Sequence, residues 1–316
     1  MPQAYTRRAY GCAVIKSVNS NYNADFTHQP RTLPDGTVYA TDKVLKYSIK
    51  NYFVRNYVED NIFYFKTFNE GMSPRTLDET YNNLFGPYPQ EKGKKADSVV
   101  RLAILSNLLK CLDIRLFGAT FAGETNISIH GPVQITHGMN RYAEGAIFSE
   151  QIMSPFRNPG DKSVDSTMST LGTQVRLREG HYVHHFSVNP QNLNEHVARV
   201  GGGASGLSTD DVDKLKEALR SGVTFYDSAS KAGTENELLL WVELNEGSKL
   251  VLPSLVELVS VVSVGPDQNR VVDLTKVRDL LAEPRVAEQV ARIELYYHAA
   301  GTKVRNAPAG AQVLPL

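Results

Sequence analysis

The chain has 316 residues, of which 41% are hydrophobic and 22% are charged, as in an ordinary globular protein large enough for a substantial core. No apolar run approaches the roughly 18 residues of a membrane span, and the N-terminal MPQAYTRRAYG lacks the apolar core of a signal peptide. We therefore expect a cytoplasmic protein, in which Cys12 and Cys111 are buried reduced thiols rather than a disulfide.

The formal net charge of zero hides an asymmetry along the chain. Residues 1–190 carry 21 Lys and Arg against 17 Asp and Glu (net +4), and residues 191–316 carry 13 against 17 (net −4). This distribution favours either a polyanion-binding face near the N-terminus or head-to-tail self-association, with ordinary fluctuation of charge as the alternative.

The first third of the chain alternates predicted elements with polar loops. Residues 9–17 predict a core strand, and an Asn- and Asp-rich loop follows it. Thr41 is placed to cap a helix over Asp42–Tyr57, and residues 61–68 predict another strand. Residues 74–95 are irregular, and a buried helix is expected over residues 97–112.

The middle of the chain is punctuated by glycine. Strands are predicted near residues 114–121 and 126–135, with a bend at Gly131-Pro132. Residues 149–180 form a polar insertion, expected to project as an extended hairpin or lobe. The segment HYVHHFSV at 181–188 predicts a strand.

The last third predicts two further helices and three strands. Ser208 and Asp211 form a capping-box-like start to a helix that ends near Gly222. The other expected elements are strands at 238–244, 255–264 and 292–298, a helix at 275–281 and a loose tail at 307–316. The order predicts an α+β fold, with a ferredoxin-like βαββαβ sheet that carries insertions.

Catalytic signals are weak. His181 and His185 would share one strand face, but their spacing matches no strong zinc signature, so a structural or RNA-contacting role is favoured over a metal site. Asp25 either acts with a metal in phosphodiester hydrolysis or, as is more usual, orders its own loop. Asp113 and Arg115 would share a strand face as an ion pair, with contact of Arg115 to a phosphate as the alternative.

Several features together favour a nucleic-acid-binding protein. The Asn-rich loop precedes a helix on which Lys43, Lys46 and Lys50 fall on one face, although a solvated face would also explain three lysines. The polar insertion carries cations and isolated Met and Phe residues, and the chain has 15 Tyr and 12 Phe available for stacking. Lysines would contact phosphates without sequence choice, and an apolar side chain on the arm would wedge between bases.

The segment DIRLFGATFA at 113–122, followed by GPVQIT at 131–136, resembles the Cas-seven family of CRISPR proteins, specifically its type I-B (Csh-two-like) branch, with the type I-C branch nearby. NSNYNADF followed by TDKVLKYSIKNYF is similar to that family's first loop and helix. TMSTLGTQVRLREGHYVHHFSVNP is similar to the end of its thumb, and LSTDDVDKLKEAL, YDSASKAG and LLLWVELNEG to its late helix and strand. The resemblance spans roughly residues 9–264; TMSTLG departs from a TMG-like thumb end, and the first loop lacks the common Asp-Pro step.

The resemblance implies a single RNA-recognition-motif palm over residues 1–316, with a finger insertion at about 69–96 and a thumb at about 149–180. It implies no enzymatic activity and no cofactor or metal. Copies would stack head-to-tail along a CRISPR RNA as the backbone of the type I-B Cascade surveillance complex in prokaryotes. The expected partners are that RNA, the target DNA strand, further copies of the chain, the large, small and repeat-end-binding Cascade subunits and, indirectly, a recruited nuclease-helicase.

The expected RNA-contacting residues lie in four groups. They are Asn19, Asn21, Asn23 and Arg31 in the first loop; Lys43, Lys46 and Lys50 on the helix; Arg115 and Gln134 in the central sheet; and Arg157, Lys162, Met168 and Arg176 on the thumb, with Met168 as the wedge.

Two other functions remain open from the sequence. One is a metal-dependent RNase of the type III backbone kind, with Asp25 as the cleaving residue. The other is a stand-alone RNA-binding module unconnected to CRISPR.

Overall fold

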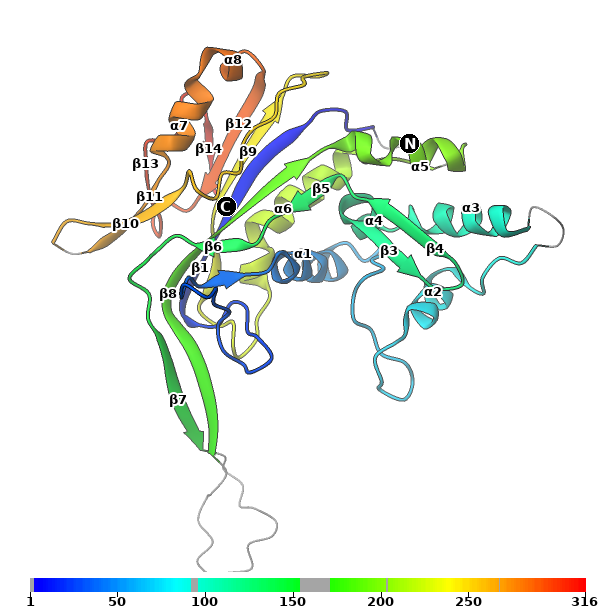
Figure 1. Ribbon diagram of the computed structural model, residues 1–316, viewed down its shortest axis with the longest axis horizontal. Helices are drawn as coiled ribbons and strands as arrows, with labels where there is room; N and C mark the ends of the chain where they lie inside the picture. Colours follow the sequence, from blue (N-terminus) through cyan, green and yellow to red (C-terminus); the bar gives the residue numbers. More distant parts are fainter. Residues whose placement is uncertain (1–2, 92–95, 154–170, 203, 267) are drawn as a thin grey trace, which may run out of the picture.

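The computed structural model describes residues 3–91, 96–153, 171–202, 204–266 and 268–316 (Figure 1). Within this part of the chain, nine strands form one large sheet, seven of them in a continuous path. In spatial order these seven are β14 (Gln312–Leu314), β12 (Val290–Tyr297), β9 (Thr234–Leu244), β1 (Ala9–Ser20), β8 (Leu171–Val188), β6 (Gly138–Asn140) and β2 (Tyr39–Ala40). β5 (Val133–Ile135) and β7 (Ile147–Met153) also pair with β8.

Strand β1 is the middle strand of the seven-strand path, and both of its faces are buried. Ala9, Ala13 and Ile15 point into one hydrophobic core, and the alternating residues Cys12 and Val14 point into another, as the two-residue period of a strand requires. β1 pairs with β8 on one side and β9 on the other, antiparallel in both cases. A segment of small and β-branched residues is therefore fixed as the middle strand of the sheet.

The two faces of the sheet are covered by different layers. Helices α1 (Asp42–Asn56) and α6 (Thr209–Phe225) pack on the face of the first core. The second core lies under a smaller sheet and two short helices. These are β10 (Ser260–Val264), β11 (Asn269–Asp273), β13 (Lys303–Arg305), α7 (Thr275–Ala282) and α8 (Pro284–Ala287).

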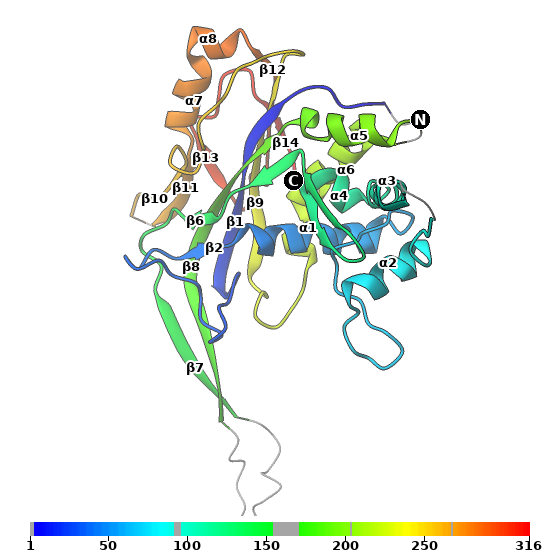
Figure 2. The same ribbon diagram turned by 45° about the vertical axis from the view of Figure 1, so that its right-hand side comes forward.

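A lateral lobe lies beside the central sheet (Figure 2). It has a hydrophobic core of its own, built around residues such as Tyr81, Leu108 and Phe121. Its elements are α2 (Leu77–Phe85), α3 (Ala96–Leu108), α4 (Leu112–Phe117), β3 (Gly118–Ala122), β4 (Asn126–His130), the 3₁₀ helix η1 (Pro190–Leu193) and α5 (Asn194–Val200). β3 and β4 form a separate two-stranded sheet. Gly118, at φ 77°, ends α4, and a Cβ there would lie 2.1 Å from the carbonyl oxygen of Ile129 on β4.

The hairpin of β7 and β8 extends well beyond the body of the molecule (Figures 1 and 2). Its register runs from Ile147 opposite Leu177 to Met153 opposite Leu171. The C-terminal half of β8 continues into the central sheet beside β1, so one long strand joins the projecting arm to the core.

The structure confirms the mixed α+β class, the strands at the start of the chain and at HYVHHFSV, and the capping box of Ser208 and Asp211. Both cysteines are buried and free, as expected. No helix among the described residues is long and apolar enough to cross a membrane.

Four segments differ from their predicted structure. The segment expected as a strand at 61–68 is irregular, because the backbone N–H groups of Phe63 and Tyr64 donate to the buried carboxylate of Asp113. The strand expected at 114–121 begins only at Gly118; the residues before it form α4. The tail expected to be loose contains β14, which pairs in parallel with β12. Helix α2, which starts with a capping box of Thr76 and Glu79, lies where an irregular segment was expected.

Candidate nucleic-acid interface

The first loop after β1 folds back on itself as a small hairpin over residues 23–31, hereafter the tip hairpin. The backbone N–H of Asp25 donates to the Gln29 carbonyl at 2.8 Å, and that of Arg31 donates to the Asn23 carbonyl at 3.3 Å. One oxygen of the Asp25 carboxylate accepts hydrogen bonds from Thr27 N and Oγ1 and from Gln29 N, at 2.7–3.0 Å. The hydrogen bond from Thr27 is the main reason that the pKa of Asp25 is lowered. Asp25 therefore orders its own loop, as an Asx turn does.

The asparagines of the first loop hold it in place. The amide nitrogen of Asn21 donates to the carbonyls of His28 and of Val175 on β8. The amide oxygen of Asn23 accepts from both N and Oγ1 of Thr41, the residue that precedes α1. Asn19 has a left-handed backbone, with φ 49°, and its carbonyl accepts from Arg176 of the β7–β8 hairpin at 2.7 Å. These contacts bring the loop, the start of α1 and the base of the hairpin together.

The three lysines predicted on one helix face differ in exposure. Lys43 is 82% exposed, 3.4 Å from Asp42. Lys46 is 20% exposed and forms an i,i+4 ion pair with Asp42 at 3.0 Å. Lys50 donates to the carbonyl of Tyr64 at 2.7 Å, and burial lowers its pKa. Lys43 is thus the lysine of this set that is open to a phosphate.

Arg115 and Gln134 lie apart from the first loop. The guanidinium of Arg115, on α4 rather than on a strand, forms a two-pronged pair with Asp211 at 2.7 and 3.0 Å. It also donates to two carbonyls at the end of α3, so the ion pair expected between Asp113 and Arg115 is wrong. Gln134 is exposed on β5, where its amide donates to the Gly131 carbonyl at 2.8 Å.

The described part of the β7–β8 hairpin offers cations on one strand and apolar groups on the other. Arg176 is 24% exposed and lies near Glu150, and the exposed Arg178 follows two residues later on the same face. Ile152 and Met153 of β7 are 45% and 61% exposed. The predicted thumb contacts Arg157, Lys162 and Met168 lie outside the described residues.

Two aromatic groups of this region were not among the predicted contacts. Phe26 is 98% exposed at the turn of the tip hairpin, and the guanidinium carbon of Arg31 lies 6.0 Å from its ring centroid. Tyr39 stacks on His137 with ring centroids 5.7 Å apart, beside the start of α1. In the sequence, Phe26 could have been identified as a candidate contact because it is an isolated large aromatic residue within a polar loop.

The histidines of β8 are buried and structural. Nδ1 of His181 lies 2.5 Å from Glu237, and Nδ1 of His185 accepts from the backbone of Leu255. His184 bridges Tyr22 and the carbonyl of Thr136. No group of three or more His, Cys, Asp or Glu side chains among the described residues is arranged to hold a metal ion.

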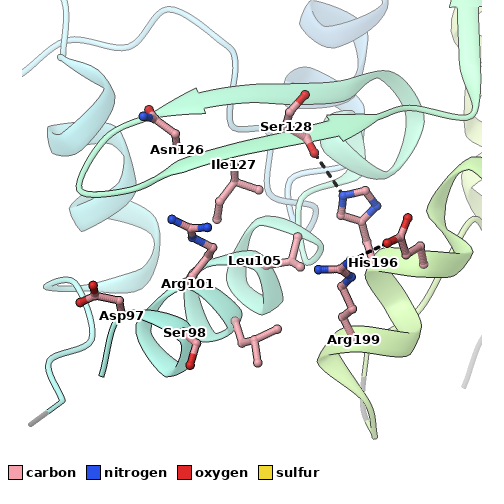
Figure 3. Close-up of a pocket in the computed structure, with 11 residues that line it drawn as sticks. Asp97, Ser98, Arg101, Leu105, Asn126, Ile127, Ser128, His196 and Arg199 are labelled. Atoms are coloured by element: carbon pink, nitrogen blue, oxygen red, sulfur yellow. Dashed lines mark hydrogen bonds and ion pairs between the residues drawn. The ribbon is translucent and has the colours of Figure 1, made fainter. Parts of the chain in front are cut away.

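A separate cavity of about 760 Å³ lies on the lateral lobe (Figure 3). α3, β4 and α5 form its walls, and His196 donates to the Ser128 carbonyl at 3.1 Å across it. Its arginines, Arg101 and Arg199, are accompanied by the carboxylates Asp97 and Glu195. This cavity is balanced in charge and offers no net attraction for a polyanion, so the exposed cations Lys43 on α1 and Arg178 on β8 are the better candidates for phosphate contacts.

The family model of CRISPR-associated protein Cas7 matches residues 7–280. The chain belongs to the Cas7 family. This match covers most of the chain, including the first loop, α1, the lateral lobe and the β7–β8 hairpin. A search of curated proteins gave no match.

Solved structures support the same fold. A chain of a structure described as "CRISPR RNA-guided surveillance complex, pre-nicking" superposes with a TM-score of 0.52 at 12% identity, over 95% of this chain and 96% of that one. A second, described as "CRISPR RNA-guided surveillance complex", gives a TM-score of 0.50 at 12% identity, over 95% of each chain. At this identity the likeness concerns the mixed α+β fold.

Proposed function

We propose that this Cas7-family chain is the CRISPR RNA-binding backbone subunit of a type I-B Cascade surveillance complex. Copies bind head-to-tail along the guide RNA and leave its bases free to pair with target DNA. Family membership supports the general role. The matched structures, described as RNA-guided surveillance complexes, are consistent with it. The type I-B assignment rests on the sequence segments that resemble that branch.

The observation that carries the proposal is the joining of three separate segments into one surface. Asn21 and Asn23 tie the tip hairpin to β8 and to the start of α1. Arg31 is hydrogen-bonded to Asn23 through its backbone, Lys43 follows Thr41 by two residues, and Arg176 donates to the carbonyl of Asn19. These connected segments therefore supply the cations that we propose as phosphate contacts along a strand. The asparagines predicted as RNA contacts act here by shaping the loop. The thumb residues Arg157, Lys162 and Met168 remain proposed contacts.

The strand order supports assigning a palm. In β9-β1-β8-β6, α1 follows β1 and α6 follows β8, and neighbouring strands are antiparallel. This is the order of a ferredoxin-like βαββαβ sheet, so we take it as the RNA-recognition-motif palm. We take the β7–β8 hairpin as the thumb and the lateral lobe, to which α2 and the start of α3 belong, as the finger region.

We propose that the chain binds RNA without cleaving it. Asp25, the candidate cleaving residue, has one carboxylate oxygen committed to three hydrogen bonds within the tip hairpin. Its depressed pKa makes it a poor proton acceptor, and no cluster of metal ligands accompanies it among the described residues. The chemistry of interference would then belong to a recruited nuclease-helicase.

The deciding experiment is to purify the chain from its native host and sequence the RNA bound to it. We expect guide RNAs with CRISPR repeat and spacer, intact after incubation with Mg²⁺ or Mn²⁺. Bound RNA without repeat sequence would contradict the proposal in favour of a stand-alone module. Shortening of a complementary RNA at regular intervals, abolished by Asp25→Ala, would contradict it in favour of a nuclease.

A further inference from the structure

We propose that Phe26 is a stacking site for one unpaired nucleobase of the bound RNA, with Arg31 beside it. This inference rests on the proposed RNA-binding function and adds a site within it. A phenylalanine ring that is 98% exposed gives up the burial that normally stabilises such a side chain by about 1.5–3 kcal/mol. A ring held in this position is available to a partner that presents a flat apolar surface.

The ring is presented by a rigid support. Phe26 follows Asp25, which accepts hydrogen bonds from the backbone N–H groups of the three residues after Phe26. Thr27 and Gln29 donate to its carboxylate, and His28 donates to its carbonyl at 3.2 Å. The ends of the tip hairpin are fixed by Asn21 to β8 and by Asn23 to α1. Because the loop is already ordered, binding a base at its tip costs little further backbone entropy.

Arg31 supplies the charge that a nucleotide requires beside its base. Its guanidinium carbon lies 6.0 Å from the centroid of the Phe26 ring. Its Nε has no hydrogen-bond partner among the residues that the structure describes, although its charge contributes to lowering the pKa of the nearby Asp25. A phosphate placed beside a base on Phe26 would satisfy this guanidinium, which pairs well with phosphate oxygens.

The surroundings of Phe26 fit a nucleobase better than a protein surface. The neighbouring residues at the tip, Thr27, His28 and Gln29, are exposed and polar. A protein that bound here with comparable affinity would need a contiguous apolar patch around Phe26. A single nucleobase needs only one ring to stack on and one cation beside it. Stacking accepts all four bases, which suits a subunit that must carry guides of any sequence.

The test compares Phe26→Ala, Phe26→Trp and a matched control, Phe68→Ala. Phe68 is also an exposed ring, 46% accessible, with Lys66 placed 5.1 Å from its centroid. Binding is measured on a single-stranded repeat–spacer RNA fragment that accommodates one copy. We expect Phe26→Ala to weaken binding by about 5- to 150-fold with an unchanged salt slope. Phe26→Trp retains binding, and Phe68→Ala binds as the unchanged protein does.

A second readout locates the base directly. With RNA that carries 5-iodouridine at successive positions, irradiation is expected to attach Phe26 to one position per copy, as seen by mass spectrometry of the digested complex. Lys43→Ala is expected to leave this adduct in place while reducing the salt slope by about 0.7, because it removes one phosphate contact.

The outcomes distinguish a failure of the proposed RNA binding from a failure of the Phe26 stacking site. Absence of RNA binding by the unchanged protein would remove the proposed function itself. Normal RNA affinity of Phe26→Ala, with no adduct at Phe26, would overturn the stacking site alone. Normal affinity combined with loss of assembly into larger complexes would overturn it in favour of a contact between copies.

Discussion

His184 shows how one side chain of the central strand supports the candidate interface. It is fully buried, accepts from or donates to the Tyr22 hydroxyl at 3.3 Å, and donates from Nδ1 to the Thr136 carbonyl at 3.0 Å. A Cβ on Gly138 would lie 2.3 Å from its ring, so the imidazole fills its site completely. Burial lowers the pKa of His184, so the ring is neutral at pH 7. With its one proton on Nδ1, which donates to a carbonyl, Nε2 accepts from Tyr22.

Burial of this neutral ring predicts a stability loss in acid. Desolvation lowers the pKa of His184 from 6.5 to about 4, so the unfolded chain binds the proton more readily than the folded one. Stability that is present above pH 6.5 is therefore lost as the pH falls toward 4, by on the order of 3 kcal/mol. Urea denaturation at a series of pH values measures this loss.

The comparison variant for this prediction is His184→Gln, which keeps hydrogen-bonding groups but does not titrate. It is less stable at pH 7, yet we expect its stability to change less between pH 6.5 and 4. If His184→Gln lost as much stability between pH 6.5 and 4 as the unchanged protein does, the loss would have to come from other titrating groups.

At the scale of single residues, the sequence identified candidate contacts but did not show which of them are committed to the fold. Composition was sufficient to mark the Asn-rich loop and Lys43. It did not show that Asn21 and Asn23 are committed to the fold or that Lys50 is committed to a carbonyl, because those partners are distant in sequence. Phe26 carried no periodic signal, since one aromatic residue in a polar loop belongs to no strand or helix pattern.

At the scale of elements, a buried ion pair joins helix α4 to the start of helix α6. Arg115 of α4 meets the carboxylate of Asp211, which is 2% exposed and also receives the backbone N–H of Ser208 in the capping box. One carboxylate thus fastens the start of α6 to the lateral lobe.

Removing the arginine alone is expected to destabilise the protein strongly. Arg115→Met leaves the Asp211 carboxylate buried without its cation, a change that typically costs about 3–5 kcal/mol. The double variant Arg115→Met/Asp211→Ser keeps a capping side chain and recovers much of this loss. Thermal and urea unfolding measure the stability of both variants.

RNA affinity and its salt slope are expected to remain unchanged in the folded fraction of either variant, because the Arg115 guanidinium is already paired with Asp211. A reduced salt slope would instead indicate that Arg115 contacts phosphate.

Elements with a strong local pattern were predicted well, and those fixed by distant contacts were not. β1, β8 and β9 follow from short β-branched and apolar runs, and α6 from its capping box and apolar period. In α4, the buried Leu112, Ile114 and Leu116 alternate as in a strand over only six residues, too few to distinguish the two periods. β14 depends on a parallel pairing with β12 that no local pattern reveals.

At the scale of the whole molecule, the projecting hairpin and the lateral lobe lie on different sides of the central sheet (Figure 1). In the proposed assembly, unlike ends of successive copies would meet in a heterologous contact, which extends into an open array along a strand. The opposite net charges of residues 1–190 and 191–316, +4 and −4, do not form two separate surfaces, because strands of both parts pair in the central sheet and ion pairs such as Arg115–Asp211 join them.

This arrangement predicts that assembly is set by RNA length. On repeat–spacer RNAs of increasing length, mass photometry or native mass spectrometry is expected to show steps of one 35.0 kDa chain for each fixed increment of RNA. The steps follow because each copy covers the same length of strand and the next copy binds beside it. High salt shortens the arrays, since it screens the phosphate contacts. A complex that stays at one chain per RNA at every length would show that the chain binds RNA as an independent module, without the head-to-tail contact.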